Sequence, residues 1–192
     1  MRLEDLRGTK PTDNVYLVGN GSNLDVRALK NPAFATNLVS RIYPQTDWRP
    51  RYYVCTDPVV LDNYRFEVEE SIKACEFAFL PHTALQTYTG KNIVPLIVKG
   101  EETDLPVTEG IYGHGSTLFI ALKLAQHMGF EEVTYLGCDL YFGKQLHFYP
   151  PEDDIMAKLS QQELSRRRLR SVQSHFHMIV FANKHRMRIN YL

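Results

Sequence analysis

The chain has 192 residues, of which 44% are hydrophobic, and its 22 basic residues balance its 22 acidic ones. This length supports one domain with a sizeable core. Zero net charge argues against broad nucleic-acid binding, which needs a basic surface. No apolar run approaches the ~20 residues of a membrane span, and the first residues have no signal-peptide core, so we expect a cytoplasmic protein without a transmembrane segment.

Apolar runs and helical patterns alternate along the chain. The expected strands are Asn14–Val18, Phe34–Leu38, Tyr52–Cys55, Phe77–Leu80, Ile93–Val98, Val133–Leu136 and Arg188–Tyr191. The expected helices are a short one in Leu24–Leu29, then Val59–Cys75, the segment from Ser116 to Met128, and Asp154–Lys184. This order predicts a single α/β domain over residues 1–192, a Rossmann-like doubly wound fold with a mostly parallel sheet. The cysteines, Cys55, Cys75 and Cys138, lack a CxxC spacing, so we predict reduced, buried thiols.

The first strand ends at the segment Gly19-Asn20-Gly21, which Asn23 follows. Glycines between a strand and a helix let backbone amides approach a phosphate. The NAD pattern is incomplete, because Leu24 stands at its third glycine and Asn37, not an acid, follows the second strand. We interpret the segment as nucleotide-binding in another way; the alternative is a tight turn without a ligand.

A second candidate phosphate site is His114-Gly115-Ser116-Thr117, before the central helix. It is not a P-loop, because it lacks the lysine. Gly137, Asp139 and Asp57 follow other strands, and ligands of doubly wound sheets bind beyond the carboxyl ends of strands. Asp57 precedes Pro58, so it could instead cap the next turn. There is no DxD motif, so we expect no metal site.

The motifs YLVGNGSNL, ATN, YYVCTDP and GST, with the block GFEEVTYLGCDLY, resemble the bacterial sialyltransferases that decorate lipooligosaccharide. They are also similar to the motility-associated factor glycosyltransferases and the pterin-pyrophosphokinase-like proteins. The resemblance implies a variant GT-A domain that transfers a sugar from a CMP-activated donor to a glycan hydroxyl without a metal. The implied partners are a nucleotide-sugar donor and a glycan acceptor, with no other cofactor. A homo-oligomer and a peripheral place at the inner membrane are compatible with it.

The resemblance also implies roles for single residues. Asn20 would face the donor phosphate or sugar, Asn37 and Asp57 would hold cytidine and ribose, and Ser116 and Thr117 would contact the donor. The family has an asparagine where Asp57 stands, and the two hydroxyl residues in reverse order.

Further along, the resemblance implies the catalytic groups. Tyr141 matches a tyrosine that donates to the departing phosphate, whereas His114 replaces an arginine. His147 is the best candidate for the general base, since histidines titrate near neutral pH. Ungapped counting instead places His147 at a second phosphate-binding tyrosine, so both roles stay open. The segment that forms the lid over the acceptor is short here, which implies a reduced lid.

Two other functions stay open: a pterin-type pyrophosphokinase-like enzyme that requires Mg²⁺, and a nucleotide-binding protein without turnover. For the other polar residues the sequence predicts no specific catalytic or binding role. Arg166-Arg167-Arg168 is expected to form a solvated helix face, with contact to an anionic acceptor or a partner as the alternative. His175 and His177 are expected on the surface or in packing contacts.

Overall fold

The computed structural model describes residues 1–101, 105–138, 147–149 and 160–192. Seven strands form one sheet in the order β5-β4-β3-β2-β1-β6-β7, and all their pairings are parallel. The strands are β1 Asn14–Val18, β2 Ala33–Thr36, β3 Tyr52–Val54, β4 Phe77–Pro81, β5 Ile93–Leu96, β6 Glu132–Leu136 and β7 Arg188–Tyr191. The predicted α/β fold with a parallel sheet is confirmed.

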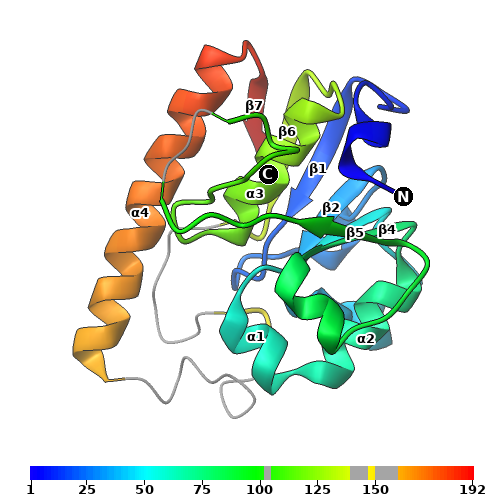
Figure 1. Ribbon diagram of the computed structural model, residues 1–192. Coiled ribbons are helices and arrows are strands. Elements are labelled where there is room, and N and C mark those ends of the chain that lie inside the picture. Colours follow the sequence, from blue (N-terminus) through cyan, green and yellow to red (C-terminus); the bar gives the residue numbers. More distant parts are fainter. Residues whose placement is uncertain (102–104, 139–146, 150–159) are drawn as a thin grey trace.

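Helices cover both faces of this sheet (Figure 1). The α-helices are α1 Pro58–Asn63, α2 Arg65–Ala74, α3 Thr117–His127 and α4 Gln161–Lys184. Short 3-10 helices are η1 Leu3–Leu6, η2 Val26–Ala28, η3 Val39–Gln45 and η4 His82–Gln86. In the described part of the chain, no helix is both long and apolar enough to cross a membrane.

Alternate residues of each strand enter two separate cores, because successive side chains of a strand point to opposite faces. In β1, Val15 and Leu17 pack on the α3 side, whereas Val18 packs on the other side, with α2 and η3. Most side chains of both cores are fully buried. The central strands β2 and β3 are buried on both faces. The helices are therefore anchored on both sides of the strands, as in a doubly wound fold.

The direction in which successive strands are added to the sheet reverses at β1. It builds β1 to β5 outward in sequence order and then returns, so that β6 pairs with the free side of β1. In open parallel sheets such a switch point opens a crevice at the carboxyl ends of the two strands. Here those ends carry Gly19 and Gly137, whose backbones are close: the Gly21 amide donates to the Gly137 carbonyl at 2.7 Å.

Several predicted boundaries are wrong for local reasons. The expected helix Val59–Cys75 is two helices, because Tyr64 leaves the helical region at φ −128° and ψ 49°. The second strand stops at Thr36, since Asn37 adopts a left-handed φ of 53°. Leu24–Leu29 forms only the 3-10 helix η2. The last helix is capped by Ser160, so it begins later than expected, and the predicted start at Asp154 is outside the described residues.

The three cysteines are free thiols. Burial raises the pKa of both Cys55 and Cys75 to about 12, so these thiols stay protonated at neutral pH. The prediction of buried thiols is confirmed for these two. Cys138 is only half-buried, because it lies at the end of β6, where its Sγ donates to the Leu136 carbonyl at 3.1 Å.

Candidate functional site

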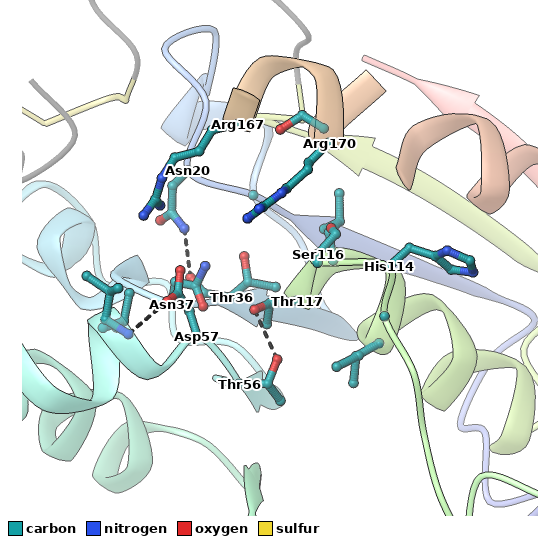
Figure 2. Close-up of a pocket in the computed structure, with 18 of the residues that line it drawn as sticks. Asn20, Thr36, Asn37, Thr56, Asp57, His114, Ser116, Thr117, Arg167 and Arg170 are labelled. Carbon is teal, nitrogen blue, oxygen red and sulfur yellow. Dashed lines mark hydrogen bonds between the residues drawn. The ribbon is translucent and has the colours of Figure 1, made fainter. Parts of the chain in front are cut away.

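A cleft of about 850 Å³ lies at the switch point, beyond the carboxyl ends of the strands. Figure 2 shows side chains from β-strand ends, from the start of α3 and from α4 facing one another across it. The polar residues that line it are Asn20, Thr36, Asn37, Thr56, Asp57, Tyr64, Lys99, Tyr112, His114, Ser116, Thr117, His147, Tyr149, Arg167, Arg170, Ser171, Gln173 and His177. The volume is within the range of small-molecule sites.

Two asparagines at the ends of β1 and β2 present unused acceptors. The Asn20 amide donates through Nδ2 to the Thr36 carbonyl at 3.0 Å, which fixes its orientation. Its Oδ1, and the Oδ1 of Asn37, are buried without a hydrogen-bond partner within the described structure. Buried acceptors are normally satisfied, and leaving one unsatisfied costs about 1–3 kcal/mol. The pair is therefore suited to accept hydrogen bonds from hydroxyl or amino groups of a ligand.

The backbone under Asn37 is held in place from the core. The Tyr53 hydroxyl donates to the Asn37 carbonyl at 2.7 Å, and the Asn37 amide donates to the Val54 carbonyl at 3.1 Å. Burial raises the pKa of Tyr53 well above its ordinary value, so the hydroxyl keeps its proton. Asparagine tolerates the left-handed φ of this position better than most residues do. Asn37 is thus fixed at the edge of the cleft.

Asp57 follows β3 and has the capping role that its position before Pro58 suggested. Its Oδ1 accepts from the Val59 amide at 2.9 Å, at the start of α1. The residue is half-buried and also lines the cleft. A cap uses only one of the two carboxylate oxygens, so capping and ligand contact are compatible here.

The start of α3 forms the opposite wall. The Ser116 Oγ accepts from the Phe119 amide at 3.4 Å as the N-cap, and the hydroxyls of Thr117 and Thr56 are 3.2 Å apart. Gly113 cannot be replaced without a shift, because a Cβ there would be 2.6 Å from the Ser116 carbonyl. The first amides of α3 have no partner within the helix, and the helix dipole places partial positive charge at this wall. This wall is suited to an anion.

His114 occupies a strained position between this wall and α4. Its φ is 47°, a left-handed value that costs a non-glycine residue about 1–2 kcal/mol. Its ring is stacked on the ring of His177 with centroids 3.8 Å apart. Backbone strain of this kind gathers at functional sites. His177 thus makes a packing contact, one of the two expected roles, and it also lines the cleft, which was not predicted.

Two arginines of α4 reach over the cleft. Figure 2 shows the guanidinium groups of Arg167 and Arg170 directed toward Asn20 and the centre of the cleft. Glu163 anchors Arg167, with Nε and Oε1 3.2 Å apart. Together with Lys99, the two arginines make three cations among the described lining residues, against the one carboxylate of Asp57. The described part of the lining is thus positive, in a chain of zero net charge.

His147 reaches the cleft from the segment after β6. It forms an isolated antiparallel bridge with Gly21, and its ring is stacked on Tyr149 at 4.9 Å. The guanidinium of Arg41, which is half-buried and paired with Glu67, lies 4.5 Å from the centre of the Tyr149 ring, so a cation also contacts this ring. A half-buried imidazole in this position is accessible from the cleft.

The structure brings most of the predicted residues together. Gly19, Gly21 and Gly137 line the same cleft as Asn20, Asn37, Asp57, His114, Ser116, Thr117 and His147. Asn23 does not line it and is exposed. Tyr141 and Asp139 lie outside the described residues. Among the residues described, no group of three or more His, Cys, Asp or Glu could hold a metal ion.

Sequence reasoning missed Arg170 and Lys99, and it placed Arg167 in a solvated face. A signal for the α4 residues exists: Arg167, Arg170 and His177 are spaced by three and seven, which puts them on one side of a helix. Lys99 follows β5, so the strand-end rule that selected Asn20 also applies to it.

Gly19→Ala tests how closely the two switch-point strands must approach. A Cβ at Gly19 would be 2.5 Å from the Gly137 carbonyl oxygen, so backbone must move. We expect a loss of about 1–3 kcal/mol in the free energy of unfolding, measured by urea denaturation. Gly100→Ala is the matched control, because its Cβ would meet nothing within 4 Å. Equal stabilities of the two variants would contradict the prediction.

Comparison with known proteins adds no family to these observations. No family model matches the chain, and no curated protein matches it significantly. The fold and the cleft therefore define the class: an α/β protein with a positively charged site at the switch point of a parallel sheet.

Proposed function

We propose that this chain is a metal-independent glycosyltransferase that takes a sugar from a CMP-activated donor and transfers it to a glycan hydroxyl. The observation that carries the proposal is the joint presence of unused acceptors and cations in one cleft. The acceptors are Asn20 and Asn37, and the cations are Arg167 and Arg170. A nucleotide needs both kinds of group, because its hydroxyl and amino groups donate while its phosphate is an anion.

Support for the donor's orientation comes from the two walls. The nucleoside would lie over the ends of β1 to β3, where Asn37 can accept from ribose hydroxyls or the cytosine amino group. The phosphate would lie between the amino terminus of α3 and the α4 arginines. Fixed positive groups around a leaving phosphate stabilise the charge that develops there. They can do the work that a divalent cation does in other transferases.

The transfer step uses His147 as the general base. It takes the proton of the acceptor hydroxyl, and the oxygen forms a bond to the anomeric carbon of the donor sugar. The bond from that carbon to the phosphate oxygen breaks, and CMP leaves with the electron pair. The hydroxyl of Tyr141 is proposed to donate a hydrogen bond to this phosphate. Arg170 would keep the phosphate in place during the step.

Nucleotide preference is the direct test. We expect CMP at about 100 times its dissociation constant to add about 2.7 kcal/mol, which raises the melting temperature by roughly 5–10 °C. The measurement is a thermal-shift panel of CMP, CDP, UDP, ATP and GTP, each with Mg²⁺ or with EDTA. The CMP response should be the same in both conditions.

Other outcomes of this panel would replace the proposal. Stabilisation by ATP or GTP only with Mg²⁺ would favour the pyrophosphokinase-like reaction. CMP binding without release of CMP from CMP-sialic acid, in the presence of glycan acceptors, would leave a binding protein without turnover. No response to any nucleotide would end the interpretation of the cleft as a nucleotide site.

A further inference from the structure

The helix α4 carries a row of exposed apolar side chains. Leu169, Val172, Phe176 and Ile179 are 60%, 48%, 64% and 38% exposed, and Val180 beside them is 48% exposed. Their spacing of three, four and three residues places them on one side of the helix. This spacing is that of the a and d positions of a coiled coil, which pack against a second helix. We call these five residues the α4 seam.

The seam lies on the outer side of α4. The inner side packs through Ser174, Met178 and Ala182 on α3 and the end of the sheet. The seam faces away from these residues, and the cleft residues Arg170 and His177 lie on a third side. The three sides of α4 thus make separate contacts, and the seam residues do not line the cleft.

The first half of α4 is less buried than its second half. None of the residues 161–173 is buried, although they form about 20 Å of helix at 1.5 Å per residue. Figure 1 shows this half of α4 extending past α3 and the strands. It carries Arg167 and Arg170 over the cleft. Because most of a helix's stability in a protein comes from tertiary packing, a partner packed on this exposed half would stabilise it.

From these observations we infer that the α4 seam is the contact between two copies of this chain, packed antiparallel about a twofold axis near Ser174. In this arrangement Leu169 meets Ile179 of the second copy, and Val172 meets its Phe176. Each large side chain is opposite a smaller or branched one, which allows interdigitation. A twofold axis makes one seam serve both copies.

Charge decides the direction of the helices. A parallel pair would bring Arg166, Arg168 and Arg170 of both copies to the same end. In the antiparallel pair Arg166 and Arg168 lie instead opposite residues 182 and 180 of the second copy, which carry no charge. The helix dipoles are then also opposed, which is favourable.

The exposed apolar area of the seam supplies about half of what a standard contact takes from each partner. The five residues offer roughly 400–500 Å² per copy, which is the size of the largest apolar patch on a typical monomer, a patch that is often functional. A standard interface takes about 800 Å² from each partner, and the stems of Arg166 and Gln173 flank the seam and can supply part of the rest. The other open edge of this region, β7, is only four residues long and begins with Arg188, features that disfavour strand addition.

Phe176→Asp tests the seam. Sedimentation should find the unaltered chain at twice its mass of 22.2 kDa, and the variant at the single mass. We expect the dissociation constant of the dimer to rise at least about 30-fold, because a central aromatic residue is replaced by a charge. Phe66→Asp on α2 is the matched control, since Phe66 is 72% exposed and should leave the dimer intact. Circular dichroism would check that both variants are folded.

Three results would overturn the inference. The unaltered chain could sediment at the single mass up to about 100 µM, Phe176→Asp could remain dimeric, or Phe66→Asp could dissociate the dimer equally. Cysteine cross-linking tests the direction. A mixture of Leu169→Cys and Ile179→Cys chains should form mixed disulfides, whereas Leu169→Cys alone should not cross-link with itself. Self-cross-linking of Leu169→Cys would overturn the antiparallel arrangement.

Discussion

His147→Ala should lower the rate of sugar transfer by about 10²–10⁴-fold while leaving CMP binding nearly unchanged. A general base contributes this much when it accepts a proton in the transition state, and it adds little to binding of the donor. The measurement is the release of CMP from CMP-sialic acid with glycan acceptors present, at saturating donor. Donor binding is measured separately by calorimetry.

His82→Ala serves as the control for this substitution. His82 is exposed on η4 and does not line the cleft, so its removal should leave the rate unchanged. If His147→Ala transfers sugar at the unaltered rate, His147 is not the base. If it instead loses CMP affinity in proportion to the rate, His147 acts on the phosphate, the other role that its sequence position left open.

Replacing both Arg167 and Arg170 by glutamine should weaken CMP binding by roughly 100-fold and leave cytidine binding unchanged. Each charge-assisted hydrogen bond contributes about 1.5–3 kcal/mol, and cytidine has no phosphate to receive one. Calorimetry with the nucleotide and the nucleoside on the same variant separates the two effects. The difference should shrink with added salt, because the lost interaction is electrostatic.

Asn37→Gly is the matched variant for the other end of the cleft. Glycine accepts the left-handed φ of 53° and removes the unused Oδ1 without adding strain. It should weaken CMP and cytidine about equally. An arginine variant that weakened both ligands equally, or an Asn37→Gly variant that weakened CMP alone, would reverse the assignment of the two ends.

The order of apolar runs was enough to predict the sheet. Strands β1 and β7 have the predicted bounds. For β1 the reason is that a largely buried strand in a parallel sheet is a short apolar run between turn residues, whereas β7 is a mostly exposed edge strand. Ser116 is the N-cap of α3, and serine just before a predicted helix is a residue type that indicates such a cap, since capping depends on a side chain and the amides a few residues away. Tyr64 and Asn37, by contrast, leave the regular conformations at positions that periodicity does not mark.

What the sequence determined by itself was the rim at which polar groups collect. Asn20, Asn37 and Asp57 follow three parallel strands, and parallel strands must present their carboxyl ends on one edge. The parallel order of the strands is enough to place these residues on one edge, so the prediction needs no knowledge of side-chain packing. Only the tertiary structure could place Arg170 and His177 over that rim. Which side of α4 faces the cleft depends on how Met178 and Ala182 pack on distant segments, and these long-range contacts are not encoded in local spacing.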